Sequence, residues 1–78
     1  MTEIADRNEI AGWMVDASVH GGSVQRFYVY ELNNKKAAAM ARTAVAATDG
    51  DWVDTVKLLT IDDLERHGLK PGEVKQII

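Results

Sequence analysis

His20 and His67 are the residues best suited to acid–base chemistry, because a histidine side chain changes protonation near neutral pH. Asp16 lies on the same face of a predicted strand as His20, and Ser18 and Ser23 place hydroxyl groups nearby. A nucleophilic serine needs a positioned base and a sharp turn that presents its hydroxyl, and no such motif surrounds these serines. A small enzyme built around His20 and Asp16 is therefore the third of three hypotheses, and we expect a protein without catalytic activity.

Acidic side chains are concentrated in the later part of the chain, where carboxylate oxygens would suit a divalent cation or a basic partner. They are Asp49, Asp51, Asp54, Asp62, Asp63 and Glu65. Their spacing differs from that of an EF-hand loop, in which the sixth residue is glycine and the twelfth is glutamate. A turn explains the first two residues, and the start of a helix explains Asp62 and Asp63. We therefore expect a solvated acidic face and no metal or other cofactor.

Basic residues offer a second kind of chemistry, the binding of nucleic-acid phosphates. The alanine-rich segment that opens with Lys35 and Lys36 resembles the last helix of double-stranded-RNA-binding domains, in which a Lys-Lys-x-Ala-Lys run contacts phosphates. Ala39 stands at the third lysine position, and that family has three strands before the helix where two are predicted here. The alternative function is nucleic-acid binding through Arg26, Lys35, Lys36 and Arg42, although the net charge of −3 argues against it.

The strongest secondary-structure signal lies at residues 33–49, which combine high helix propensity with an apolar stripe at helical spacing. The stripe consists of Ala37, Met40, Ala41, Ala44, Val45 and Thr48. Asn33 or Asn34 can cap the start of this helix, and Gly50 can adopt the left-handed conformation that ends it. Because most of the stripe is small, the helix needs larger side chains facing it.

Residues 13–20 alternate between apolar and polar side chains, which predicts a half-buried strand. Gly21 and Gly22 can supply the positive φ angles of a two-residue hairpin turn. A symmetric hairpin around them would pair Val19 with Val24, Ala17 with Arg26, Val15 with Tyr28 and Trp13 with Tyr30. This register would put the tryptophan and both tyrosines under the helix and would turn Phe27 to the opposite face.

That opposite face is the main candidate for binding. In the predicted register Met14, Phe27 and Val29 form an apolar cluster there without a covering helix. Such a cluster indicates an interaction surface, unless residues 1–12 or the tail 69–78 fold over it. We therefore expect a protein partner or self-association, through this face or through a sheet edge.

Residues 52–60 predict a third strand rich in β-branched side chains. Two apolar sets compete for its inward face, namely Val56 and Leu58 against Val53 and Leu59. Thr60 can cap a short helix after this strand, and Gly68 can end that helix. The spacing of Leu64 and Leu69 matches the hydrophobic contact that accompanies such an end.

The predicted architecture is a single α+β domain over residues 1–78. It has a small three-stranded sheet (β-hairpin, helix, third strand), one long alanine-rich helix on one face and a short C-terminal helix. The start is ambiguous, since Thr2 could cap a short helix or Ile10 could lead into the first strand. With 78 residues and no cysteine, the fold depends on its core or on self-association. The sequence shows no signal-peptide or membrane-spanning pattern, so we expect a cytoplasmic protein-interaction or regulatory module.

Overall fold

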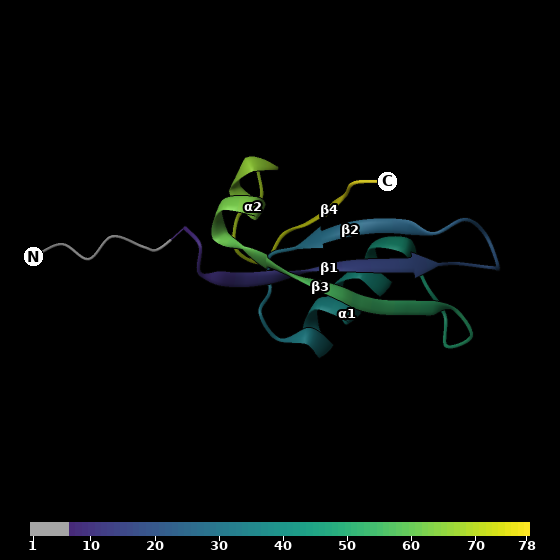
Figure 1. The fold of residues 1–78 in the computed structure, drawn as a ribbon. Helices are drawn as coiled ribbons and strands as arrows, with labels where there is room; N and C mark the ends of the chain where they lie inside the picture. The colour runs from purple at the N-terminus through teal and green to yellow at the C-terminus, as the bar shows by residue number, and fades with distance from the viewer. Residues whose placement is uncertain (1–6) are drawn as a thin grey trace, which may run out of the picture.

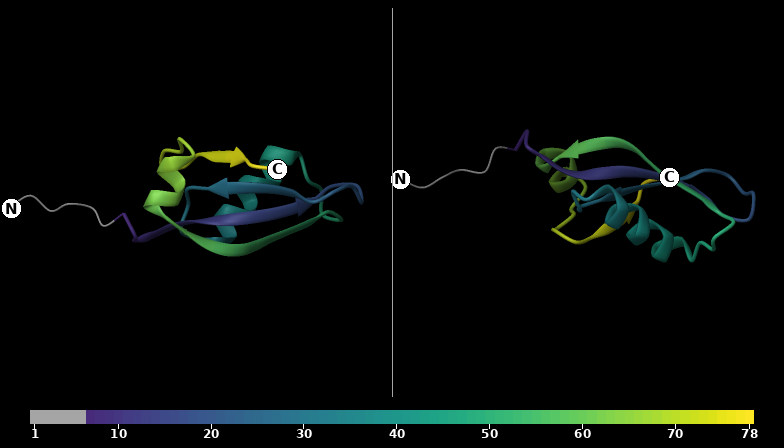
Figure 2. Two further views of the ribbon diagram at one scale, coloured as in Figure 1. Left: turned by 45° about the horizontal axis from the view of Figure 1, so that its top comes forward. Right: turned by 90° about the horizontal axis from the view of Figure 1, so that it is seen from below.

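The computed structural model describes residues 7–78, which form one antiparallel sheet and two helices (Figure 1). The elements are β1 (Ile10–Ser18), β2 (Gln25–Val29), α1 (Asn34–Val45), β3 (Trp52–Thr60), α2 (Ile61–Arg66) and β4 (Val74–Gln76). The strand order is β3-β1-β2-β4 (Figure 2). The predicted α+β class is confirmed, but the prediction of three strands is wrong because it lacks β4. Thr2, which could cap a short helix in one of the two predictions for the start, lies outside the described residues. β1 begins at Ile10, as the other prediction had it.

β1 and β2 pair one residue away from the predicted register, with Val15 opposite Phe27 and Trp13 opposite Val29. This shift exchanges the two faces of β2. Phe27 and Val29 are buried beneath α1, whereas Tyr28 lies on the other face, so the predicted exposure of Phe27 and Val29 is wrong. This arrangement buries phenylalanine, which has no polar atom, and spares Tyr28 a place under α1 where its hydroxyl would need a hydrogen-bond partner.

The turn of this hairpin and one extra unpaired residue between the turn and β2 together produce the shift of one residue. Its centre is at His20 and Gly21, whose φ angles are 56° and 71°, one position earlier than the predicted glycine pair. The backbone N–H of Gly22 donates to the carbonyl oxygen of Val19 at 3.0 Å and closes the turn. Regular pairing begins only at Gln25, so the connection is longer than a two-residue hairpin and sets a different register.

α1 packs small residues against one face of the sheet. The core cluster there consists of Val15, Ala17, Phe27, Val29, Ala37 and Ala41, with Met40 and Val45 partly buried at its margin. Asn33 caps the helix, since its side-chain oxygen accepts from the N–H of Lys36 at 3.0 Å. The helix ends at Ala46, which has a left-handed conformation with a φ of 54°, and not at Gly50 as predicted.

α2 and the residues that follow it cover part of the opposite face. Leu59, Leu64 and Leu69 are buried there, and Met14 and Tyr28 pack against them. The predicted contact between Leu64 and Leu69 is confirmed, and the N–H of Leu69 donates to the carbonyl oxygen of Leu64 at 3.1 Å. The tail thus covers this face in part, through Leu69.

Candidate functional site

β3 forms one margin of the sheet, and no strand of residues 7–78 lies beyond it (Figure 2). It is nine residues long and pairs with β1 alone. Within the described part of the chain, no backbone–backbone hydrogen bond besides this pairing involves residues 53–59. An edge strand directs half of its N–H and C=O groups outward, so β3 presents a row of them over about 30 Å.

Three large apolar side chains of β3 are exposed to solvent. The exposed fractions are 48% for Trp52, 41% for Val56 and 42% for Leu58. Natural edge strands are usually short or carry charges that discourage pairing, and β3 does carry Asp54 and Lys57. It nevertheless combines length with apolar exposure, whereas β4 at the other margin has only three residues. An extended partner segment would therefore make more contact at β3.

A β-bulge changes the direction of side chains in the middle of β3. Two successive residues of β1 face Lys57 and Thr55, so Val56 is an extra residue without an opposite partner. In a regular strand, residues three positions apart project from opposite faces. Because of the bulge, Asp54 and Lys57 project from the same face of the sheet.

The face that carries Asp54 and Lys57 also holds an ion pair next to β3. Arg26 donates to both carboxylate oxygens of Asp16, from Nε at 2.8 Å and from Nη2 at 3.0 Å, and Asp16 is only 7% exposed. The hydrogen bond and the charge of Asp16 raise the pKa of Arg26 above its ordinary value. Asp54 lies opposite Asp16 in the β1–β3 ladder, so the carboxylate of Asp54 lies next to a carboxylate that Arg26 already pairs.

The predicted binding cluster of Met14, Phe27 and Val29 is not one surface. Phe27 is 2% exposed and Val29 is fully buried, both beneath α1. Met14 lies on the opposite face, against the cluster that contains Leu64. The shifted register separates these side chains, and a partner could reach neither Phe27 nor Val29 in this arrangement.

The four basic residues of the nucleic-acid hypothesis lie in different parts of the fold. Lys35 and Lys36 belong to the first turn of α1, and Arg42 belongs to its last turn. The guanidinium of Arg42 donates to the carbonyl oxygen of Thr48 at 3.2 Å and so holds the loop that follows the helix. Arg26 is separated from the other three by the sheet, since it pairs on the face opposite α1. The structure does not bring these side chains together.

The residues of the enzyme hypothesis are held in structural contacts. His20 belongs to the hairpin turn, and its backbone N–H donates to the carboxylate of Asp51 at 2.9 Å. The hydroxyl of Ser18 donates to the carbonyl oxygen of Gly22 at 2.7 Å, and Asp16 is engaged in the ion pair described above. Two of these contacts lie within the hairpin and the third joins its turn to the loop before β3, and none of them pairs a nucleophile with a base.

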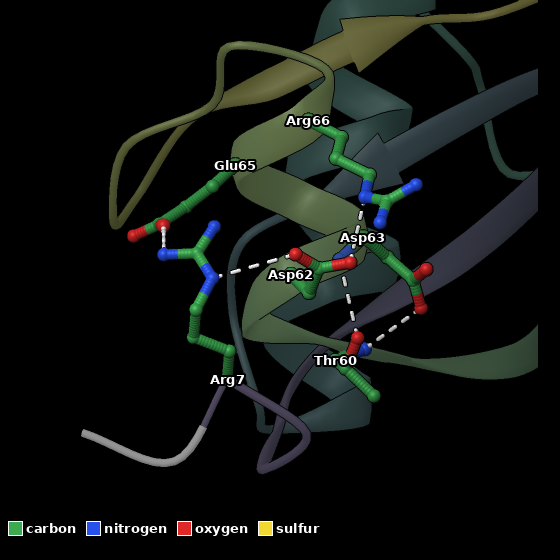
Figure 3. Close-up of polar contacts among 6 residues, drawn as sticks. All are labelled: Arg7, Thr60, Asp62, Asp63, Glu65 and Arg66. Carbon is green, nitrogen blue, oxygen red and sulfur yellow. Dashed lines mark hydrogen bonds and ion pairs between the residues drawn. The ribbon is translucent and has the colours of Figure 1, made fainter. Parts of the chain in front are cut away.

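The acidic residues around α2 are also paired (Figure 3). Arg7 bridges Asp62 and Glu65, with N–O distances of 3.4 Å and 2.5 Å. Thr60 and Asp63 exchange side-chain-to-backbone hydrogen bonds of 3.1 Å in a capping box, which confirms the prediction that Thr60 caps the short helix. Within residues 7–78, no group of three or more histidine, cysteine or acidic side chains is placed to hold a metal ion.

Comparison with protein-family models, with curated proteins and with solved structures finds no match for this chain. Across residues 7–78, no helix has the length and apolar character needed to cross a membrane. A binding site is therefore inferred from the geometry of the chain itself. Sequence reasoning missed Trp52, Val56 and Leu58 as candidates. The available signal was the presence of apolar side chains at both odd and even positions of 52–60, which a bulge produces.

Proposed function

We propose that this protein is a small non-catalytic interaction module that binds an extended polypeptide segment along the outer margin of β3. The supporting observation is a nine-residue edge strand with Trp52, Val56 and Leu58 exposed. The added segment would pair its backbone with the outward N–H and C=O groups of β3, as in other cases of β-strand addition. The two faces of the sheet offer less accessible surface to a partner, because α1 covers one face and α2 with Leu69 covers part of the other.

Affinity and specificity at this margin would come from different groups. Backbone hydrogen bonds do not depend on the sequence of the partner and contribute about 1 kcal/mol each. Burial of the exposed parts of Trp52, Val56 and Leu58 would add on the order of 3 kcal/mol. Asp54 and Lys57 would favour partners with opposite charges at the matching positions, because like charges directly opposite each other are destabilising.

A peptide-display selection tests the proposal. Random peptides long enough to span β3 are selected on immobilised wild-type protein, and their affinity is then measured by fluorescence anisotropy. A Val56→Lys/Leu58→Lys variant should bind the recovered peptides about tenfold more weakly or worse, because it puts charges where apolar contacts form. Val24→Lys is the matched control, since Val24 is 50% exposed and lies outside the strands.

Two outcomes would contradict the proposal. One is a selection that recovers no binding peptide. The other is a set of peptides that bind the double variant as tightly as they bind the wild type and the Val24→Lys control. Thermal melting of each variant distinguishes a blocked margin from an unfolded protein.

A further inference from the structure

We infer that the partner at this margin is a second copy of the same chain, paired β3 to β3 in one defined register. The inference rests on the function proposed above and specifies its occupant. A twofold axis perpendicular to the sheet would relate the copies and join their sheets into one. The axis passes between Thr55 and Val56, and it puts Asp54 of each copy opposite Lys57 of the other.

The bulge makes this register possible. Residues directly opposite each other in an antiparallel pair project from the same face. Asp54 and Lys57 satisfy this condition because Val56 is an extra residue between them. In a regular strand Asp54 and Lys57 would project from opposite faces. The same alignment would then put them opposite each other in the ladder with their side chains on different sides of the sheet.

The apolar residues of β3 agree with the same register. It places Val53 of one copy opposite Leu58 of the other, and both residues project from the face of α1, where they lie opposite Ala17 and Trp13 of β1. Each cross-copy pair would cover part of the exposed area of Leu58. The ion pairs and the apolar pairs thus form on opposite faces of the joined sheet.

Charge complementarity selects this register over its neighbours. A shift by one residue puts residues of opposite faces opposite each other. A shift by two residues in one direction puts Asp54 opposite Leu59 and Lys57 opposite Val56. In the other direction it puts Asp54 opposite Thr55 and Lys57 opposite Trp52, and both shifts leave the two charges without an opposite charge in the other copy. Asp54 and Lys57 are exposed, and neither forms an ion pair within residues 7–78. Only the first register pairs them.

Lys57 therefore has two effects on the margin. A lysine in the middle of an edge strand discourages pairing with an arbitrary strand. In the self-pairing register it meets a carboxylate, so the same side chain that makes pairing with an arbitrary strand less favourable is compatible with a second copy.

A charge exchange tests the ion pairs. Sedimentation velocity of the wild type from micromolar to millimolar concentration should show a dimer that forms as concentration rises. Asp54→Lys and Lys57→Asp should each weaken this association by about tenfold or more, because each puts like charges opposite each other on both sides of the axis. An equimolar mixture of the two variants should associate again, since every opposed pair in the mixed dimer has opposite charges.

Cysteine cross-linking tests the register. The chain contains no cysteine, so introduced thiols react without background. Asp54→Cys mixed with Lys57→Cys should form a disulfide between positions 54 and 57 under mild oxidation. Either variant alone would hold its two thiols about 10 Å apart, beyond the reach of a disulfide.

The outcomes separate this inference from the function on which it rests. A wild type that stays monomeric at millimolar concentration would overturn self-pairing, and selected peptides that still bind β3 would leave the proposed function standing. Cross-linking of either cysteine variant alone, as fast as in the mixture, would overturn the register. If neither peptides nor a second copy bind at β3, both the inference and the proposed function fail.

Discussion

Gly12 of β1 approaches the carbonyl oxygen of Val29 in β2 so closely that no side chain fits between them. A Cβ atom at position 12 would overlap this oxygen, and it would also lie 2.9 Å from Cδ1 of Leu64 in α2. Backbone on one side and a buried leucine on the other leave little room to adjust. The pairing of β1 with β2 and the packing of α2 against the sheet therefore both depend on a glycine at position 12.

Replacing this glycine should be costly. Gly12→Ala should lower the free energy of unfolding by about 2–4 kcal/mol, because the strands or α2 must move apart. Urea denaturation measures the change. Gly50→Ala is the control, since a Cβ there meets no atom within 4 Å, and it should change stability by less than about 0.5 kcal/mol. Equal midpoints for the two variants would show that the close approach of Gly12 is not a constraint.

The end of α1 predicts a stabilising substitution. Ala46 holds the left-handed conformation that glycine adopts without steric cost, with a φ of 54°. Ala46→Gly should raise the free energy of unfolding by about 0.5–1 kcal/mol, after the greater chain entropy of glycine is subtracted. Ala39→Gly, at an exposed position inside α1, should lower it by about 1 kcal/mol. Calorimetry would contradict this account if both variants shifted the melting temperature in the same direction.

The junction of β3 and α2 depends on the capping box. Thr60 accepts a hydrogen bond from the N–H of Asp63, and Asp63 accepts one from the N–H of Thr60. Thr60→Ala removes the first bond and should cost about 1 kcal/mol in urea denaturation. Thr60→Ser keeps a hydroxyl at the cap and should cost less than half as much. If alanine and serine prove equivalent at this position, the cap does not stabilise the junction.

The carboxylate of Asp51 predicts a loss of stability in acid. It accepts hydrogen bonds from the backbone N–H groups of Thr48 and His20, both at 2.9 Å, and these bonds lower the pKa of Asp51 below its ordinary value of 3.8. A carboxyl group with a lower pKa in the folded state stabilises the fold above its unfolded pKa. That contribution is lost as pH falls through the folded pKa.

Asp51→Asn should therefore reduce stability at pH 7 and flatten the fall in melting temperature below the ordinary pKa of 3.8. Melting curves between neutral and strongly acidic pH compare the variant with the wild type. An unchanged slope in acid would show that the hydrogen bonds from Thr48 and His20 do not couple protonation to folding.

Local sequence signals were sufficient for β3 and α2. The strand at 52–60 lies between a turn and a capping threonine, and its β-branched residues favour the extended conformation. The ambiguity about its inward face reflects the bulge at Val56. Val53 contacts the core under α1, and Leu59 contacts the cluster around α2, so both faces of the strand are partly buried.

The register of the hairpin could not be predicted from its pattern, because alternate residues of β2 are apolar or aromatic on both faces. The turn that helps to set this register contains a histidine, His20, at a positive φ. Local propensity does not favour that conformation for histidine. β4 was missed for a related reason. Its three residues are extended because they pair with β2, far away in sequence, and such pairing leaves little local signal.

The end of α1 was predicted too late because the helix pattern continues past it. Thr48 donates its N–H and its hydroxyl to Asp51, which turns the chain toward β3 before Gly50 can serve as the stop. The exposed residues Trp52, Val56 and Leu58 were missed because their exposure follows from the position of β3 at the edge of the sheet. That position depends on which strands pair with β1, and this pairing is not encoded locally in residues 52–60.

Amide hydrogen exchange along β3 tests most directly whether its outer margin is the contact surface. Exchange is measured by NMR at micromolar and at millimolar concentration, and again with a peptide recovered by selection. The structure predicts that added protection falls on outward amides of residues 53–59 and is absent in the Val56→Lys/Leu58→Lys variant. Protection that falls on α1 or β4 instead, or that never develops under either condition, would contradict the assignment of this margin.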